Sequence, residues 1–419
     1  MRRNGLNAVI FSLVVSGCRF DASGSATSAT LEEDSGADDA AFVAEDALVD
    51  DRPVLDPVDS SGSVDTAVAT DDADASTLGW TEKDWLYRRR LVIDGSLVAG
   101  DLTDFVVPIV FTEGDMISKV TLDGRDLRFT RTDGTLLAFE LVRWDAAGSL
   151  VAWVKVPKLG PALPNDLYLY YGNAVATSAA DPKKTWSGEV GVWHFDENTV
   201  DGGTTTKLAD ATTGGHDGMQ NGTEATPGLL LGAQKFDGKD WVELAKSSEI
   251  VLGDTDCTFS AWVRTTESRQ QGILIKAKGE GHETGDKLIG TGHEGPFFGV
   301  DHGWVGFSRT NIAIQDGKWH HVAWVQNKDV KDKAESWRLY LDGVERAAAQ
   351  FETKPDLVGH SVRIGGKASG SYFDNLWTGD IDEGRYSKSA RGPGWIATLE
   401  RSQRSPATFV KVGGEESLK

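Results

Sequence analysis

The stretch CTFSAWVR, residues 257–264, decides the fold of this chain. Successive side chains of a β-strand point to opposite faces of the sheet. One face of this strand therefore carries only apolar side chains, those of Phe259, Ala261 and Val263. The other face carries two hydroxyl groups and the indole of Trp262. A strand with one wholly apolar side is expected to pack against a hydrophobic core.

The same pattern extends over residues 189–390, where short strand-like runs alternate with turns rich in Gly and Asp. The runs include GVWHFDE, LLLGAQKFDGKDWVEL, GILIKAK, GWVGFS, KWHHVAWVQN, SWRLYLDG, SVRIGGK and GDIDEGRYS. About a dozen strands in one segment predict a two-sheet jelly roll. The 48 glycines and 14 tryptophans of the chain suit a β-rich fold with many tight turns.

Residues 79–175 form a second, smaller set of predicted strands. The runs RRRLVIDG, DFVVPIVF, SLVAWVKVP and NDLYLYYGN have strand character, and Asp133-Gly134 is a hairpin signal. No run combines a helical period with caps, so an antiparallel sandwich is expected. The predicted fold class is all-β, with two β-sandwich domains joined by a linker at 176–188.

The C-terminal segment, residues 391–419, is predicted to hold a short helix beginning near Pro393 and one final strand in ATFVKVGGEE. The sequence leaves open whether this strand closes the second sandwich or returns to the first.

Residues 1–18 have the order of a secretory signal: two arginines, a short apolar stretch and small residues before Cys18. The apolar stretch is too short for a membrane span. Val15-Ser16-Gly17-Cys18 resembles a bacterial lipobox, which implies that the Cys18 thiol is lipidated and becomes the mature N-terminus. The alternative is an ordinary signal peptide with a chance cysteine. Because Arg19 follows Cys18 in place of aspartate, the resemblance favours the outer membrane of the cell envelope.

Residues 19–78 are predicted to be a disordered acidic linker. From Asp21 to Leu78 there are sixteen Asp and Glu and one Arg, a net −15 of the chain's −21. Such a segment cannot bury enough apolar surface to offset its ordering entropy, and its like charges extend it. We expect it to space the folded part from the membrane. The acidic balance argues against nucleic acid as a partner.

The smaller set of strands resembles a known bacterial domain. WLYRRRLVID, DGRDLRFTRTDGTLLAFELVRW, VAWVKVP and LYLYYGN, in this order, are similar to DUF2341, a domain of unknown function. The resemblance implies a β-sandwich that is often followed by a laminin G-like domain, and it implies no chemistry.

The larger set resembles the laminin G-like, concanavalin A-type jelly rolls. The motifs that carry the resemblance are FDGKDWVEL (236–244), TFSAWVR (258–264), KWHHVAWV (318–325), LYLDG (339–343) and GDIDEGRY (379–386). In the last motif Gly384 and Tyr386 stand where the family usually has branched apolar residues. We therefore expect a bulged or looser strand there.

The resemblance also implies a Ca²⁺ site near the FDG turn and the closing Ile-Asp-Glu strand. The residues that match are Asp237 and Asp382, with backbone carbonyls completing the oxygen ligands that calcium prefers. The alternative is that Asp237 caps its turn and Asp382 bonds to backbone amides. Two carboxylates alone do not specify a metal site.

A long Gly-rich insertion at 280–304 is the predicted ligand site, since binding residues concentrate on loops held by a rigid scaffold. Its aromatic residues Phe297, Phe298 and Trp304 are the candidates for ligand contact. The histidines of this region lack zinc spacing and are interpreted as loop polarity. His320 and His321 are neighbours on a strand, so they point to opposite faces and cannot chelate one ion together.

These features predict a non-catalytic lipoprotein whose jelly roll binds an extracellular glycan or a surface protein. One alternative is a glycoside hydrolase or lyase on the same scaffold. Hydrolases of this fold use a Glu-x-Asp-x-x-Glu strand, whereas residues 380–385 read Asp-Ile-Asp-Glu-Gly-Arg and depart at both glutamate positions. The other alternative is a purely structural envelope module. Fold alone does not decide between them.

Overall fold

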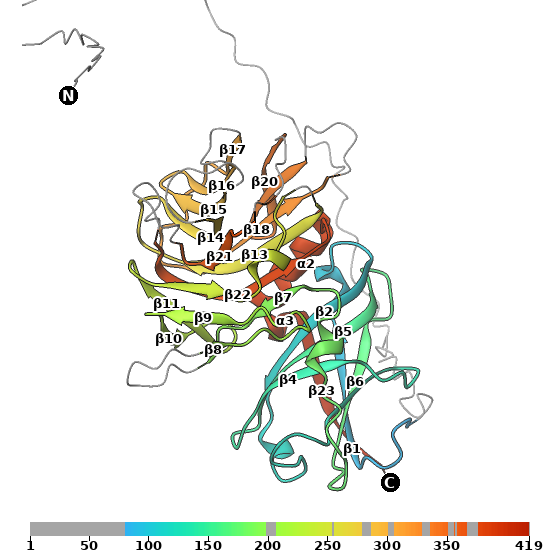
Figure 1. Ribbon diagram of the computed structural model, residues 1–419. Helices are drawn as coiled ribbons and strands as arrows, with labels where there is room; N and C mark the ends of the chain where they lie inside the picture. The colour runs from blue at the N-terminus through green and yellow to red at the C-terminus, as the bar shows by residue number, and fades with distance from the viewer. Residues whose placement is uncertain are drawn as a thin grey trace, which may run out of the picture. The chain divides into compact units, whose positions relative to one another are not determined.

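The computed structural model describes residues 80–197, 207–253, 255–278, 286–300, 306–328, 336–350, 356, 358–366 and 376–418 (Figure 1). All of them fall within one compact unit, Asp71–Lys419. Cys18, the acidic tract and Trp304 lie outside the described residues, so the predictions made for them stay predictions. Among the described helices, none combines the length and the apolar character that a membrane crossing needs.

The first sandwich consists of strands β1 to β6 together with β23. One sheet contains, in spatial order, β23 (Val410–Ser417), β1 (Tyr87–Ile93), β6 (Asp166–Tyr171) and β3 (Arg128–Arg131). The other contains β2 (Leu102–Thr112), β5 (Ser149–Leu159) and β4 (Phe139–Trp144). Short 3-10 turns, η2 (Gly95–Leu97) and η3 (Gly114–Met116), flank β2. The two sheets enclose a core that includes Phe105, Leu150 and Leu169.

The jelly roll consists of strands β7 to β22. One sheet, named here the β13 sheet, contains β10 (Glu224–Pro227), β11 (Gly232–Asp237), β22 (Thr378–Ser387), β13 (Cys257–Arg264), β18 (His320–Gln326), β19 (Trp337–Leu341) and β20 (Val344–Ala349), with β7 (Gly191–Trp193) beside β22. The β14 sheet contains β17 (Gly306–Arg309), β16 (Gly295–Val300), β15 (Lys287–Gly292), β14 (Gln271–Ala277), β21 (Ser361–Ile364), β12 (Trp241–Leu244), β9 (Gly218–Asn221) and β8 (Lys207–Leu208). The 3-10 turn η4 (Ser247–Glu249) follows β12.

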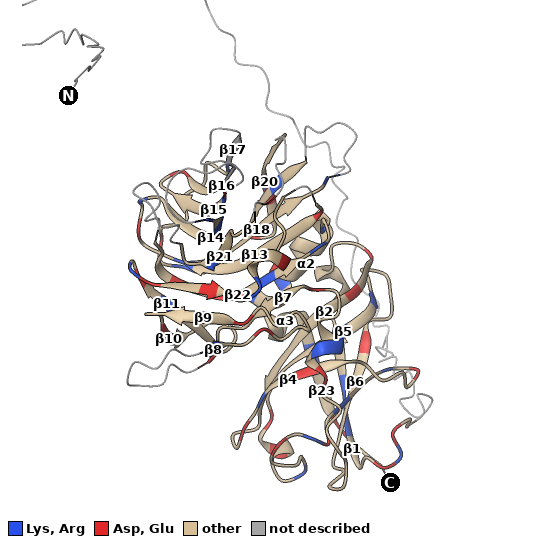
Figure 2. Cartoon of the chain, in the orientation of Figure 1, with Lys and Arg blue, Asp and Glu red and all other residues tan. Residues whose placement is uncertain are grey.

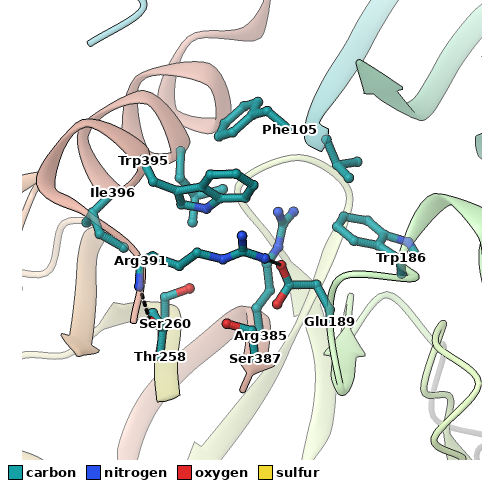
Figure 3. A pocket seen from close by; sticks show the side chains of 12 residues that line it. Phe105, Trp186, Glu189, Thr258, Ser260, Arg385, Ser387, Arg391, Trp395 and Ile396 are labelled. Carbon is teal, nitrogen blue, oxygen red and sulfur yellow. Dashed lines mark hydrogen bonds and ion pairs between the residues drawn. The ribbon is translucent and has the colours of Figure 1, made fainter. Parts of the chain in front are cut away.

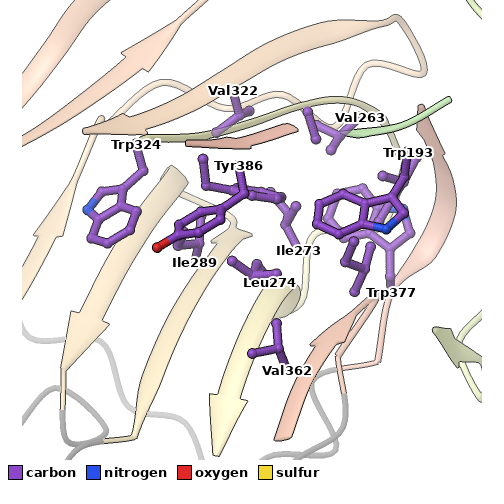
Figure 4. Packing of buried hydrophobic residues seen from close by; sticks show 14 of the residues in the cluster. Trp193, Val263, Ile273, Leu274, Ile289, Val322, Trp324, Val362, Trp377 and Tyr386 are labelled. Carbon is purple, nitrogen blue, oxygen red and sulfur yellow. The ribbon is translucent and has the colours of Figure 1, made fainter. Parts of the chain in front are cut away.

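Strand β13 packs as its alternation predicts on one side. Phe259, Ala261 and Val263 lie in the core between the two sheets, and Cys257 is a buried free thiol there. Figure 4 shows Val263 among the core side chains. The opposite face is also buried, because Trp262 donates its indole N–H to Gln403 of a C-terminal helix. The sequence pattern did not reveal this covering element, since it lies far along the chain.

That helix, α2 (Pro393–Arg404), begins with Pro at its first position, where a missing N–H costs no hydrogen bond. It packs through Ile396 on the outer face of the β13 sheet, against Ala323 and Tyr340. The short helix α3 (Pro406–Phe409) and strand β23 follow. β23 pairs antiparallel with β1, so the final strand returns to the first sandwich.

The segment between the sandwiches is more ordered than the prediction of a linker at 176–188 implies. It contains the one-turn helix α1 (Pro182–Thr185) and Trp186, which is only 1% exposed. The Trp186 ring lies 5.5 Å from that of Trp153 in β5. The prediction rested on Pro and small residues, and it overlooked the large apolar side chain at the end of the segment. The predicted all-β fold class is confirmed, with the sheets antiparallel throughout the pairings described.

Candidate functional site

A surface pocket of about 190 Å³ lies where strands β14 to β17 end in the β14 sheet. It is lined by Gln270, Gly292, His293, Glu294, Gly295, Phe297 and Arg309. Most of these residues come from the hairpin between β15 and β16, where Gly292 pairs with Gly295 across a two-residue turn. The turn therefore presents His293 and Glu294 at the rim of the pocket.

Glycine is required at the end of this turn. Gly295 has φ 86°, a conformation that other residues rarely adopt. A Cβ atom there would also collide with the backbone carbonyl of Ile312. A backbone hydrogen bond of 2.9 Å from Thr310 N–H to the Pro296 carbonyl holds the hairpin to the following segment. The polar rim thus rests on a fixed backbone.

The charges of the pocket are balanced. Glu294 and Arg309 form an ion pair, and their side chains are 43% and 41% exposed. His293 and Gln270 are exposed as well. Both signs of charge and an amide are therefore available to a ligand from the solvent side.

The predicted ligand residues Phe297 and Phe298 lie on opposite faces of the β14 sheet. Phe297 is almost fully buried and forms the apolar floor of the pocket, packed with Ile275 and Leu288. Phe298 points to the opposite face, into the core, where its ring stacks on those of Trp324 at 4.7 Å and Trp337 at 4.4 Å. The assignment of Phe298 as a ligand contact is therefore wrong, because neighbouring strand residues face opposite sides. Trp304 lies outside the described residues.

Sequence reasoning missed all four polar residues of this pocket, Gln270, His293, Glu294 and Arg309. It assigns His293 to loop polarity alone. The signal that could have found it is the Gly-His-Glu-Gly stretch at 292–295, in which two glycines bracket two polar residues in a tight turn.

The acidic residues of β22 lie in a different part of the jelly roll, and one of them, Glu383, is linked through His194 to the first sandwich. Acidic and basic residues lie side by side along this strand (Figure 2). Asp380 bonds to Arg264 at 2.7 Å, and Asp382 and Glu383 are 1% and 5% exposed. The expected irregularity is present: the register with β13 shifts between Asp382 and Arg385, and Glu383 adopts φ 50°.

His194 connects Glu383 to the first sandwich. Its Nδ1 lies 2.9 Å from Glu383 Oε1, and its Nε2 lies 3.1 Å from Oε2 of Glu140 in β4. Burial disfavours the charged imidazole, but the two carboxylates outweigh it and raise the pKa of His194 well above its ordinary value. A protonated ring donates to both carboxylates, so this trio is an ion network between the two sandwiches.

Arg385 of β22 extends the network. It bonds to Glu383 at 3.1 Å, and its guanidinium lies 4.4 Å from the ring centre of Trp153 and 4.6 Å from that of Trp186. The neighbouring cavity in Figure 3 is closed by Glu189 and Arg391, which form a 2.7 Å ion pair. Only about 20 Å³ remains free there, room for about one water molecule. This cavity is part of the interface and does not admit a larger ligand.

The predicted calcium pair is not brought together. Asp237 pairs with Thr378 across the ladder, four positions before Asp382, or about 13 Å along the strand. Asp237 is exposed and accepts the backbone N–H of Lys239 at 2.8 Å. Asp382 accepts the backbone N–H of Leu229 at 2.7 Å, and burial, reinforced by Glu383, raises its pKa well above the ordinary value.

These two aspartates therefore match the alternative of a turn cap and a backbone acceptor, and as a pair they do not fit Ca²⁺. Within the described ranges, no group of three or more His, Cys, Asp or Glu residues could hold a metal ion. In the loop after β8, the backbone carbonyls of Asp210 and Thr212 accept hydrogen bonds from the ammonium of Lys183 in α1.

The remaining histidines of the motif KWHHVAWV are structural. His320 lies between Asp342 at 2.8 Å and Asp316 at 3.2 Å. His321 points to the other face and contacts the ring of Trp262, and burial lowers its pKa to about 3. The opposite orientations predicted for the pair are thus present.

Comparisons with known proteins match two segments of the chain. The family model described as the concanavalin A-like lectin/glucanases superfamily matches residues 236–397. The model of DUF2341, a domain of unknown function, matches residues 123–208. The chain thus holds a DUF2341 domain followed by a concanavalin A-like domain. The DUF2341 match begins and ends later than the expected 79–175. No curated protein matches the chain.

Several solved structures are similar to the chain. One is domain 4 of AbnA, a GH43 extracellular arabinanase from Geobacillus stearothermophilus, in complex with arabinotriose; identity is 18%, the TM-score is 0.39, and the match covers 51% of this chain and 98% of that one. Another is the CBM40 of the Ruminococcus gnavus IT-sialidase bound to α2,3-sialyllactose, with 15% identity, TM-score 0.31, and 35% and 82% coverage. A third is the binding domain of Paraclostridial Mosquitocidal Protein 1, with 12% identity, TM-score 0.36, and 51% and 52% coverage. The chain thus spans about half the length of this third structure.

Proposed function

We propose that this chain is a non-catalytic binding protein and that the pocket at the β15–β16 hairpin takes a glycan. The observation that carries the proposal is the combination of an apolar floor at Phe297 with solvent-facing polar groups from His293, Glu294, Arg309 and Gln270. Small-molecule sites typically join an apolar surface to a few convergent polar groups. The match of this domain to the lectin/glucanase superfamily points to the same class of ligand.

The pocket suits one sugar ring. A sugar has an apolar C–H face, which Phe297 and the two hairpin glycines can cover, and a rim of hydroxyl groups, which carboxylate, guanidinium, imidazole and amide groups can bond. Its volume of about 190 Å³ is below the roughly 300–1,000 Å³ of pockets that take drug-sized ligands. Binding of a terminal sugar residue of a longer chain fits this size.

The charge balance favours a neutral sugar over an acidic one. Glu294 neutralises Arg309 in an ion pair, so an anionic ligand would have to compete for the guanidinium. A neutral hydroxyl pair can bond to both members without breaking them apart. We therefore place neutral hexoses or pentoses ahead of sialic or uronic acids.

The acids of β22 support the non-catalytic proposal. A glycoside hydrolase needs two carboxyl groups that flank the bond it cleaves, roughly 5 to 9.5 Å apart. Asp382 and Glu383 are almost completely buried, and Glu383 bonds to His194 and Arg385. A polysaccharide chain could not reach them without separating the first sandwich from the jelly roll.

A lipid on Cys18 would hold the chain in the outer membrane, and the acidic tract would let the binding domain reach an extracellular partner. The predicted pair Asp237 and Asp382 does not form a calcium site. The binding test nevertheless includes calcium as a variable.

A glycan array tests the proposal with the chain from Arg19 onward, with and without a chelator. We expect retention on neutral glycans and a loss of about tenfold or more in Glu294→Gln and in Arg309→Gln, since each removes one member of the pair. Lys318→Gln is the matched control, because that side chain is 79% exposed and lies outside the pocket.

Binding that survives both pocket variants would place the ligand elsewhere. An array without any bound glycan would favour the surface protein or the structural module over the glycan. Release of sugar from a polysaccharide, abolished in Asp382→Asn, would favour the hydrolase.

A further inference from the structure

The first and last strands of the described chain lie side by side. In the sheet order β23-β1-β6-β3, strand β1 is held between β23 and β6, and each pairing contains six residue pairs (Figure 1). The β1–β23 register shifts once, between Arg89 and Leu91. Tyr87 at the start of β1 faces Ser417 near the C-terminus, and Ile93 at its end faces Val410. The N-terminal chain therefore enters β1 at the end opposite the one where β23 begins.

The beginning of β23 is fixed to the jelly roll through α2. Gln403 accepts the indole N–H of Trp262, and Arg404 bonds to Asp342 at 2.7 Å. On its other side α2 bonds to the first sandwich, where Thr398 Oγ1 accepts the N–H of Ala99 at 2.9 Å. Helix α2 is thus hydrogen-bonded to both the jelly roll and the first sandwich.

Side chains reinforce the β1 pairings. Arg88 bonds to Glu416 of β23 at 2.7 Å, and its guanidinium lies 4.2 Å from the ring centre of Tyr168 in β6. Arg90 forms an ion pair with Asp166 of β6. The Arg-Arg-Arg run at 88–90, which the proposed glycan site does not use, therefore ties β1 to both of its neighbours.

We propose that these strands form a mechanical clamp, which carries tension between the N-terminal tether and the jelly roll. A pull on the N-terminal chain, resisted at the jelly roll through α2, draws β1 lengthwise past β23. Ladder hydrogen bonds are perpendicular to the strands, so this pull strains the bonds of the β1–β23 pairing together. The β1–β6 ladder adds less resistance, because Tyr87 faces Tyr171, the end at which the chain leaves β6 for the jelly roll. The clamp holds for any ligand and any anchor that transmit force along this path.

The same bonds resist weakly when the pull comes from the two chain ends. Tyr87 and Ser417 face each other, so opposite forces on the N- and C-termini open the β1–β23 ladder one pair at a time. Resistance to force is governed by the unfolding rate along the pulling direction, and not by equilibrium stability. A comparison of the two directions therefore isolates geometry, because the protein is the same in both.

Single-molecule force spectroscopy on the chain from Arg19 onward tests the clamp. One handle sits at the N-terminus and the other at Lys318→Cys on the jelly roll, or else at the C-terminus. We expect a first rupture force several-fold higher with the jelly-roll handle. Equal forces in the two geometries overturn the proposal, and so does a first event that separates the sandwiches while leaving both folded, which the released chain length reveals.

Deletion of residues 410–419 gives a second measurement with the jelly-roll handle. The remaining β1–β6 ladder should rupture at a clearly lower force, and an unchanged force overturns the proposal. Should the shortened chain fail to fold, the comparison of pulling directions in the intact chain still decides. Loss of glycan binding in the pocket variants leaves both measurements unaffected.

Discussion

At the scale of single residues, one position along a strand decides a side chain's role. Phe297 and Phe298 are adjacent and chemically identical, yet one forms the floor of a pocket and the other stacks in the core. The alternation rule predicts opposite faces but not which face is open. That choice depends on the second sheet, and the sequence of the insertion does not contain that information.

The loss of stability caused by replacing His194 should depend on pH. Its pKa is raised in the folded state, so its contribution to stability is complete below an unfolded pKa of about 6.5 and is lost as pH rises through the folded pKa. His194→Gln should lower the free energy of unfolding by about 3 kcal/mol near pH 6, because it leaves Glu140 and Glu383 without their shared partner. The deficit should shrink toward alkaline pH.

Urea unfolding of both proteins between about pH 6 and about pH 10 measures this effect. Lys184→Gln is the control, since that side chain is 79% exposed. A deficit that stays constant over the whole range would show that the imidazole acts by packing and not by charge.

At the scale of elements, the C-terminal helix and strand show the limit of local patterns. Pro393 and the apolar run in ATFVKV indicate a helix and then a strand. The sequence cannot say which sheet the strand joins, because strand pairing depends on free edges and on the path that leads to them. Here α2 lies on the outer face of the β13 sheet, and its end directs β23 to the open edge of β1.

Phe409→Ala tests this element. Phe409 is fully buried in the core of the first sandwich, and its carbonyl accepts the N–H of Asp94 at 2.9 Å. The variant should lose about 3–5 kcal/mol of stability. Hydrogen exchange should show the loss at the amides of β1, far away in sequence. Thr408→Ala, at an exposed neighbouring position, should change stability by no more than about 0.5 kcal/mol. Unchanged protection of β1 in Phe409→Ala would mean that β23 does not stabilise the first sheet.

At the scale of the whole molecule, composition and strand patterns predict two all-β sandwiches, but they do not predict the polar interface that joins them. Its members lie far apart in sequence: Glu140, Trp153, Trp186, His194, Glu383 and Arg385. Glu140 and Trp153 lie in the motifs that resemble DUF2341, and Glu383 and Arg385 lie in GDIDEGRY, the motif whose acids suggested metal binding or catalysis. The contact between these motifs is a tertiary property that no local pattern reveals.

Trp186→Ala tests whether the two sandwiches unfold as one unit. Trp186 contacts Trp153 and Arg385 and donates its indole N–H to Glu140, so its loss opens a cavity in the interface and should cost about 3–5 kcal/mol. Calorimetry should show one transition for the wild type and two for the variant. Ser187→Ala, next to it and exposed, should melt as the wild type does. A single transition in Trp186→Ala would assign the coupling to α2 and β23 alone.

The pairing of β23 with β1 also constrains the order in which the chain folds during translation. Translation delivers β1 before the jelly roll and β23 after it, and domains generally fold as the ribosome releases them, N-terminal ones first. The first sandwich departs from that order, since its sheet keeps an unpaired edge until β23 has emerged. Any product terminated before β23 would expose this edge, a ready template for aggregation and a mark by which quality-control proteases could recognise incomplete chains.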